Sequence, residues 1–291
     1  MGLHMKEFVA RWPVTIFVAL TLGFQVTIVL VAWAMMPSGS HLHDFPEAHS
    51  VFRLRVFGPL LFSMVITWYL DGKGGLKKLF SGFLRWRVGP QWYALGFGWK
   101  FLFTYIGIGT IALLGIRAWP GFFVDNFWGG THEAFIALVK NMPFIVGIAV
   151  VEETSWMKFS VTRLQEKYSA VRSCAIIGVC WGLWYLPMLV LGEGVPDGIP
   201  WYFFMLSMFA LTILLGWTYN MTHSGVVLLV MQIVSNSAFM MLPVLPGWWD
   251  GDPTFVIAFV LANFSMAMLI LWRYGGEHLA TKVRAKWSDP M

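Results

Sequence analysis

The sequence predicts an all-α fold, a polytopic membrane helical bundle with about eight transmembrane helices. Hydrophobic residues make up 58% of the 291 residues and charged residues only 12%, about half the charged share of an ordinary soluble domain. The 17 Trp and 25 Phe suit a bilayer and its interfaces. Apolar runs of about 20 residues, long enough to cross a bilayer as a helix, recur along the chain. This composition excludes a soluble two-domain enzyme, a disordered chain and an ordinary nucleic-acid-binding protein.

Eight apolar runs follow one another in sequence with short connections between them. The second run is short and the fourth carries charged residues, so the boundaries of these two are the least certain from sequence. No linker, internal repeat or low-complexity tract divides the chain, so we expect a single transmembrane domain over residues 1–291. In order, the predicted spans are 13–36, 54–70, 92–116, 134–157, 171–191, 200–219, 224–246 and 254–273.

Basic residues are unevenly divided between alternate connections. The N-terminus, the 71–91 loop, the 158–172 segment and the C-terminus together hold 15 of the 20 Lys and Arg residues. Under the positive-inside rule, this pattern predicts that both termini are cytoplasmic. The net charge of +5 is therefore a topology signal that brings basic side chains to anionic lipid headgroups, and it does not indicate a nucleic-acid partner. Compact size and short loops favour the plasma membrane of a prokaryote.

Few ionisable residues fall inside the predicted spans, and such residues are functional candidates because burial of a charge in a bilayer is costly. We expect Lys100 and Lys140 to extend their amines toward an interface. The adjacent pair Glu152 and Glu153 ends a long apolar stretch. On a helix their side chains point about 100° apart, so one can face a cavity and the other a neighbouring helix. Alternatively, both glutamates mark the end of the fourth span and pair with the basic residues that follow, Lys158 or Arg163.

Two later spans also carry polar groups at mid-membrane. Tyr185 and Pro187 interrupt the fifth run, and Gln232 and Asn236 lie four residues apart in the seventh, which places both amides on one helix face. These residues could have purely structural roles. Amides hydrogen-bond between membrane helices for roughly 1 kcal/mol each, and a tyrosine hydroxyl can reach a backbone carbonyl.

Three segments together resemble the motifs of the CAAX protease and bacteriocin-processing family, also called the type 2 CAAX prenyl protease or Abi family. That family has the motif E-E-x-x-x-R, an aromatic residue followed four positions later by His, and H-x-x-x-N. Residues 152–157 are similar to the first motif, 181–187 to the second with its surroundings W-x-L-W-H-L-P, and 232–236 to the third. The order and spacing agree, which marks residues 134–246 as the family-like core.

The resemblance implies an eight-helix intramembrane endopeptidase that needs no cofactor or metal ion. It implies that Glu152 is the general base that activates a water, that Glu153 supports it, and that Asn236 holds the oxyanion. Tyr185 and Gln232 occupy the positions of the two family histidines. The expected partners are a membrane-embedded peptide or protein and the lipid bilayer.

The sequence departs from the family motifs at three positions. Met157 stands in place of the arginine, Tyr185 in place of the first histidine and Gln232 in place of the second. Imidazoles transfer protons near neutral pH, whereas a glutamine does not titrate and a tyrosine mostly donates a hydrogen bond. Since a general acid or base contributes about 10²–10⁴ in rate, these changes predict weak or absent hydrolysis. His223 is no simple replacement, because it lies about 13 Å along a helix axis from Gln232.

Two functions therefore stay open, an endopeptidase with impaired catalysis and a pseudoprotease that binds membrane peptides or helices as a chaperone, immunity factor or assembly factor. A transporter has less support, because the chain shows no inverted internal repeat. The His-rich stretch 41–49 has a metal-like composition, but we expect a solvated loop.

The site hypothesis predicts that Glu152, Tyr185, Gln232 and Asn236 share one cavity toward the cytoplasmic half, within about 10 Å of one another. It also predicts a hydrogen bond from Tyr185 or Gln232 to a glutamate, because an uncompensated carboxylate there costs several kcal/mol.

Overall fold

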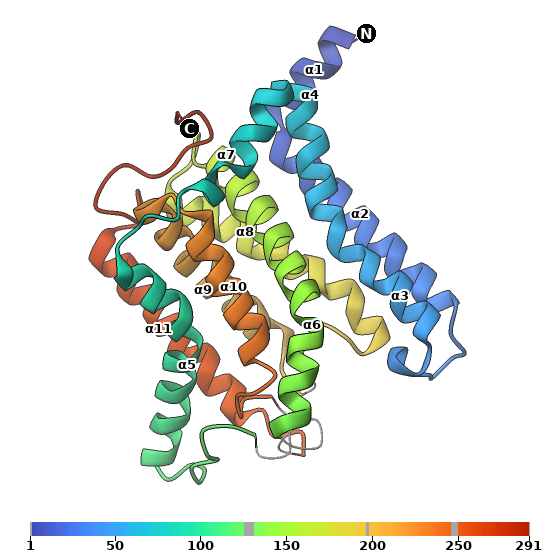
Figure 1. The fold of residues 1–291 in the computed structure, drawn as a ribbon, viewed down its shortest axis with the longest axis vertical. Helices are drawn as coiled ribbons and strands as arrows, with labels where there is room; N and C mark the ends of the chain where they lie inside the picture. Colours follow the sequence, from blue (N-terminus) through green and yellow to red (C-terminus); the bar gives the residue numbers. More distant parts are fainter. Residues whose placement is uncertain (1, 125–130, 196–197, 246–249, 291) are drawn as a thin grey trace.

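The computed structural model describes residues 2–124, 131–195, 198–245 and 250–290. Within these ranges the chain is 76% helical and has no strand, which confirms the prediction of an all-helical membrane bundle (Figure 1). The α-helices are α1 (Gly2–Arg11), α2 (Pro13–Ala34), α3 (Pro46–Leu54), α4 (Gly58–Phe80), α5 (Pro90–Leu113), α6 (Thr131–Glu152), α7 (Thr162–Leu164), α8 (Ala170–Tyr185), α9 (Trp201–Thr222), α10 (Gly225–Ala238) and α11 (Thr254–Tyr274).

Proline marks the start of four of these helices. It occupies the first or second helical position of α2, α3, α4 and α5. A proline there loses no intrahelical hydrogen bond, and its fixed φ angle already suits a helix. The predicted spans that begin at 13, 54 and 92 start within a few residues of α2, α4 and α5, whereas α3 was not predicted as a helix.

Seven helical stretches of the described residues are long and apolar enough to cross a membrane. The eighth apolar helix, α10, has 14 residues, about 21 Å at 1.5 Å per residue. The predicted seventh span, 224–246, is therefore too long. Helix α10 ends at Ala238, and Pro243 follows within a few residues and cannot continue a helix. Residue 246 lies outside the described residues.

The fourth span continues beyond its predicted end. Helix α6 passes directly into a π-helical segment, η5 (Glu153–Val161), and then into α7. The Ser160 hydroxyl donates to the Ser155 carbonyl, five residues back, at 2.8 Å. Such wide turns are rare and often occur at functional sites. Here the wide turns begin directly after Glu152, the first candidate catalytic residue.

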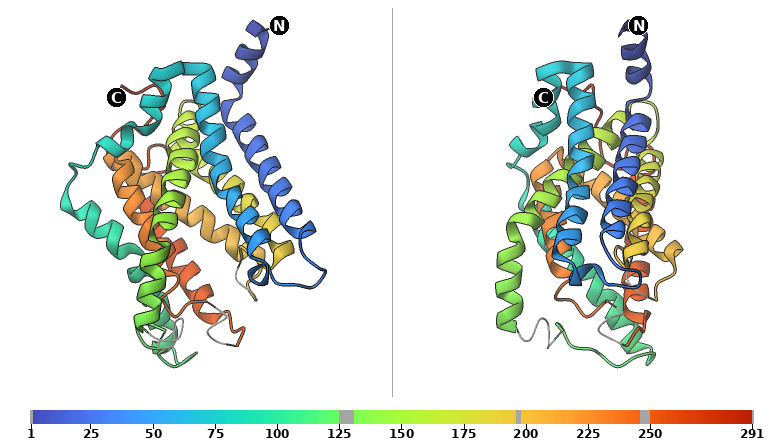
Figure 2. Two further views of the ribbon diagram at one scale, coloured as in Figure 1. Left: turned by 45° about the vertical axis from the view of Figure 1, so that its right-hand side comes forward. Right: turned by 90° about the vertical axis from the view of Figure 1, so that its right-hand side faces the viewer.

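Helices that are distant in sequence lie side by side in the bundle. Helix α11 packs against both α5 and α9, α9 packs against α8, and α10 packs against α5. Helices α2 and α4 run together along one side (Figures 1 and 2). Small residues allow the closest approach. A Cβ atom on Gly107 of α5 would lie 2.8 Å from the backbone of Ala258 in α11. The two helices therefore meet backbone to backbone at this point.

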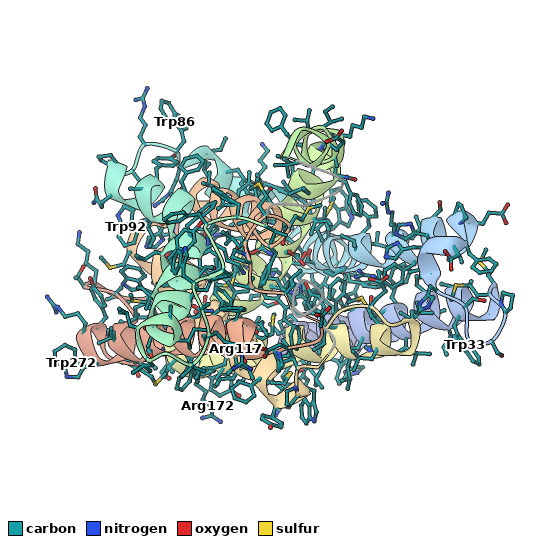
Figure 3. All side chains as sticks on the ribbon, turned by 90° about the horizontal axis from the view of Figure 1, so that it is seen from below. Trp33, Trp86, Trp92, Arg117, Arg172 and Trp272 are labelled. Carbon is teal, nitrogen blue, oxygen red and sulfur yellow. The ribbon has the colours of Figure 1, made fainter. Side chains whose placement is uncertain are left out.

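Large apolar side chains cover the outside of the bundle. Trp33 of α2 is 51% exposed and Trp272 of α11 is 83% exposed, and both lie at the periphery when the bundle is viewed along its length (Figure 3). In water these surfaces would be unfavourable, whereas a bilayer solvates them. The exposed tryptophans thus agree with a protein that is integral to a membrane.

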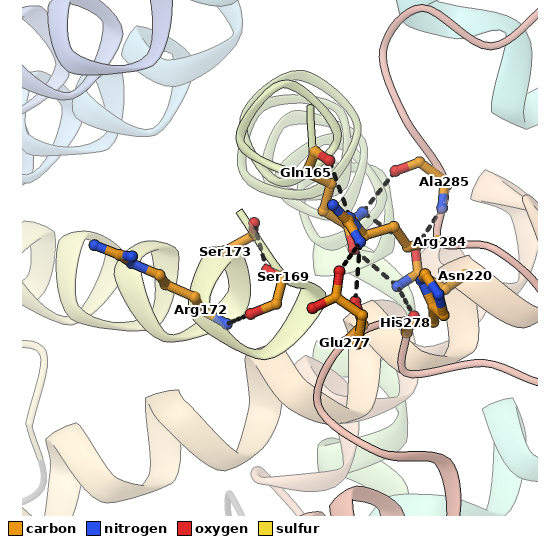
Figure 4. Close-up of polar contacts among 9 residues, drawn as sticks. All are labelled: Gln165, Ser169, Arg172, Ser173, Asn220, Glu277, His278, Arg284 and Ala285. Atoms are coloured by element: carbon orange, nitrogen blue, oxygen red, sulfur yellow. Dashed lines mark hydrogen bonds and ion pairs between the residues drawn. The ribbon is translucent and has the colours of Figure 1, made fainter. Parts of the chain in front are cut away.

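Both termini lie at the same end of the bundle (Figures 1 and 2). The segment after α11 folds back and is held by buried amide groups (Figure 4). Asn220 and Gln165 bond to each other through both amide groups, at 2.9 and 3.1 Å. Asn220 also donates to the His278 carbonyl at 2.9 Å and accepts from the Ala285 amide at 3.1 Å. These bonds fix the C-terminal segment against α7 and α9.

Candidate active site

A hydrogen bond joins the first and third motifs at the centre of the bundle. The Gln232 amide nitrogen on α10 donates to Glu152 Oε2 at the end of α6, at 2.6 Å. Both side chains are buried, with 2% and 4% of Glu152 and Gln232 exposed. The expected hydrogen bond to a glutamate is therefore confirmed, and Gln232 makes it from a motif histidine position. The other amide atom, Gln232 Oε1, has no hydrogen-bond partner.

Tyr185, at the end of α8, reaches the same carboxylate. Its hydroxyl interacts with Glu152, while its ring packs edge-on against Trp184 and Phe204, with centroids 5.2 and 5.3 Å away. The aromatic neighbours fix the ring so that the hydroxyl points at the glutamate. Three elements, α6, α8 and α10, thus bring Glu152, Tyr185 and Gln232 together.

Arg55, at the start of the predicted second span, adds a positive charge near the glutamate. It lies in the short 3-10 helix η2 (Arg55–Phe57), and its guanidinium interacts with Glu152 and Tyr185 through space. It stacks over Trp184, with 5.1 Å between the guanidinium carbon and the ring centroid. Met157, the residue in place of the family arginine, is fully buried and apolar. Arg55 is therefore the nearby cation for the glutamate site, although it comes from another part of the chain.

Glu153 is buried in a different environment from its neighbour. Only 2% of it is exposed, and neither carboxylate oxygen has a hydrogen-bond partner. The alternative in which the glutamates pair with the following basic residues is not what the structure shows. Arg163 bonds Asp71 at 2.7 Å, and Lys158 lies near the rings of Tyr219 and Trp287. A buried carboxyl group without a partner is costly, which argues for a functional reason to keep it.

A cavity of about 600 Å³ lies next to this group, within the range of small-molecule sites. Tyr185, Gln232 and Asn236 all line it, so three of the predicted site residues share one cavity. Glu152 is not part of the lining. It bonds Gln232, which does line the cavity.

The position of the cavity corrects the expected location of the site. Its lining includes residues 192–195, which follow the end of α8 that points away from both termini (Figure 1). The site was expected in the half that holds the termini, and the cavity instead extends from mid-bundle toward the opposite end. The reason lies in the register of the helices. Helix α6 and its continuation run 12 residues beyond Glu152 toward the terminal end, from 153 to 164, so the carboxylate lies deeper than the predicted span end suggested.

Lys100 behaves differently from a lysine that extends to the membrane surface, which corrects a second expectation. It is 2% exposed and lines the cavity. Its amine contacts the Ser235 hydroxyl at 3.3 Å and lies 3.3 Å from the centroid of the Phe239 ring. Lys140, by contrast, is exposed on α6. Since α5 lies against α10 and α11, Lys100 has no path to an interface.

The His-rich stretch touches the rim of the cavity. His43 Nε2 lies 3.1 Å from Glu193, which itself lines the cavity. Within the described ranges, no group of three or more His, Cys, Asp or Glu side chains is arranged to hold a metal ion. His223 is placed elsewhere, at the end of α9 beside Tyr219. Burial lowers the pKa of its imidazole.

Sequence reasoning did not place Arg55, Lys100 or Ser235 in this region. Arg55 is separated from Glu152 by about a hundred positions, and no local pattern connects them. A signal was present for the other two. Ser235 precedes Asn236 within the third motif segment, and Lys100 is a charge in the middle of an apolar run.

A comparison with protein-family models supports the resemblance noted above. Residues 134–238 match the model described as type II CAAX prenyl endopeptidase Rce1-like. This region contains Glu152, Glu153, Tyr185, Gln232 and Asn236, and it spans α6 to α10. A search of curated proteins found no match. The description of the matched model is that of an endopeptidase family. Over residues 134–238, this helical membrane protein is similar to the CAAX protease family.

Proposed function

We propose that this protein binds an apolar segment of a membrane peptide or helix in its cavity and does not hydrolyse it with the glutamate pair. The observation that carries the proposal is the Gln232–Glu152 hydrogen bond of 2.6 Å. An amide holds the carboxylate oxygen that would have to bind and activate a water. The role is that of a pseudoprotease, which acts as a chaperone, immunity factor or assembly factor.

The chemistry of the substituted side chains supports the proposal. A neutral histidine can accept a proton and then return it, whereas a glutamine amide does neither. Glu152 also lies outside the cavity lining, so a bound peptide would meet Gln232 and Tyr185 first. Loss of two proton-transfer groups is expected to remove several orders of magnitude in rate.

A specific observation favours a second function, a slow endopeptidase. Asn236, the family's oxyanion residue by resemblance, still lines the cavity. The Tyr185 hydroxyl faces Glu152 and could orient a water if the Gln232 amide moved. In this case Glu152 stays the general base, Glu153 supports it, and catalysis is weak.

Two measurements separate the functions. A photoreactive amino acid at Leu211, which lines the cavity, should cross-link membrane polypeptides in native membranes, and the same group at Trp272 on the outer surface should give a different, weaker set. Membrane-protein termini are then compared by mass spectrometry between cells that carry the wild type and cells that carry E152Q at equal protein levels. Identical termini agree with the pseudoprotease. Termini that depend on Glu152 overturn it and support the endopeptidase.

A gain-of-function variant makes the test sharper. The double substitution Tyr185→His and Gln232→His restores both imidazoles next to Glu152. If the absence of the imidazoles is what prevents hydrolysis, the variant should cut a polypeptide identified by the cross-linking experiment at least about 10²-fold faster than the wild type does. The matched control is Y185F/Q232L, which should remain folded and inactive. An unchanged rate in the folded histidine variant would show that the site lacks more than its imidazoles.

A further inference from the structure

The cavity holds a second pair of reactive side chains, which are not among the residues of the glutamate site. Lys100 comes from α5 and Ser235 from α10, and their nitrogen and oxygen atoms lie 3.3 Å apart. Both residues line the cavity, although only 2% of Lys100 and 6% of Ser235 is exposed. We propose that Ser235 and Lys100 form a Ser–Lys dyad that hydrolyses an acyl ester or amide with an apolar chain.

The surroundings of Lys100 suit a general base. Among the described residues, no ion pair joins its amine to a carboxylate. The Phe239 and Phe259 rings lie 3.3 and 4.4 Å from its nitrogen, so the amine is held between aromatic faces and the Ser235 hydroxyl. A lysine that lacks a counter-ion and contacts a serine hydroxyl is the arrangement found in Ser–Lys hydrolases. A structural lysine at this depth would instead be expected to have an acidic partner.

The neighbours of Ser235 supply the other parts of an acyl-transfer site. Asn236 lines the same cavity and carries a side-chain amide that can donate to an oxyanion. The indole N–H of Trp181, another lining residue, has no hydrogen-bond partner. The remaining lining is mostly apolar, for example Leu211. The cavity can therefore hold a hydrocarbon chain while a carbonyl group lies near Ser235.

The reaction balances with water as the only co-substrate. The proton of the Ser235 hydroxyl passes to Lys100 while Oγ bonds to the acyl carbon, and the Asn236 amide stabilises the oxyanion. Collapse of this intermediate breaks the bond to the leaving alcohol or amine, which takes the proton from Lys100. Water then attacks the acyl-enzyme with Lys100 again as base. The carboxylic acid leaves, and Ser235 regains its proton.

The proposal uses the cavity of the proposed function but neither its peptide ligand nor the glutamates. The purified full-length protein in lipid nanodiscs is treated with a decyl fluorophosphonate, in which Ser235 Oγ would displace fluoride at phosphorus. Mass spectrometry of the digested protein should place the adduct on Ser235. The adduct should be absent in S235A and present at the wild-type rate in S237A, whose buried hydroxyl lies two residues away.

Substitutions of Lys100 test the dyad itself. Arginine keeps the positive charge but cannot act as a base, and methionine keeps the packing without an amine. Both K100R and K100M should lower the rate of adduct formation at least about 10²-fold, while K140R leaves it unchanged. Two variants are used so that one folded protein remains if the other fails to fold. No Ser235 adduct in the folded wild type, or an unchanged rate in either folded Lys100 variant, overturns the proposal. Neither result bears on cross-linking at Leu211, so the two proposals can fail separately.

Discussion

Replacement of Asn220 by alanine should release the C-terminal segment and destabilise the protein. The Asn220 side chain takes part in four hydrogen bonds, three buried and one partly buried, with Gln165, His278 and Ala285 as partners. At about 0.5–1.5 kcal/mol each, they contribute about 2–6 kcal/mol to the free energy of unfolding. Gln165 keeps a separate bond to the Ala285 carbonyl at 2.7 Å, so we expect a loss in the lower half of this range, about 2–4 kcal/mol.

Denaturant-induced unfolding in one detergent measures this loss, and tryptic cleavage at Lys282 or Lys286 reports release of the segment. Cleavage at these sites should accelerate by at least tenfold in N220A. The matched control is Asn141→Ala, because the Asn141 amide makes one hydrogen bond, to the carbonyl four residues earlier in its own helix. A loss below about 1 kcal/mol with unchanged cleavage would show that these amide bonds do not hold the segment.

Two further predictions concern packing and pH. Gly107→Ala should cost about 1–3 kcal/mol in unfolding free energy, because its Cβ would meet backbone 2.8 Å away. The control is Gly109→Ala on the same helix, whose Cβ would meet nothing within 4 Å and which should be neutral or stabilising. Equal losses of unfolding free energy in the two variants would refute the close contact. Hydrogen bonds from Thr254 and Arg117 lower the pKa of Asp252 to about 2. This stabilisation is present above the ordinary aspartate pKa of about 4 and is lost as pH falls toward 2. Asp252→Asn should therefore flatten the dependence of Tm on pH between 4 and 2. Parallel curves of Tm against pH for the wild type and the variant would contradict this prediction.

Spanning helices were predictable because a bilayer imposes one length and one polarity on them. The failures occur where other constraints act. Helix α10 is shorter than its apolar run, since turns and Pro243 follow Ala238. A hydropathy pattern records which residues tolerate a nonpolar environment, and the residues of that turn are as apolar as those of the helix.

The glutamate site was predictable only as far as motif spacing reaches. The resemblance identified Glu152, Tyr185, Gln232 and Asn236, and the Gln232–Glu152 bond follows from facing positions on two helices. Arg55 joins this group through tertiary packing alone. Lys100 was expected at the surface because a long side chain usually finds water. Aromatic rings just after α10 and on α11 surround it instead, and sequence alone does not show which face of α5 is covered.

The π-helical segment η5 changes how this chain can tolerate a change of length. Each of its turns closes through a hydrogen bond five residues back, so it contains more residues per turn than an α-helix. Deletion of one residue between 153 and 161 can be absorbed by a return to α-helical hydrogen bonding. Glu152 then still faces Gln232, and Arg163 still faces Asp71. The same deletion in the regular helix α9 would rotate one half against the other by about 100°. Length variation among homologous chains should therefore concentrate in this segment, next to the glutamates.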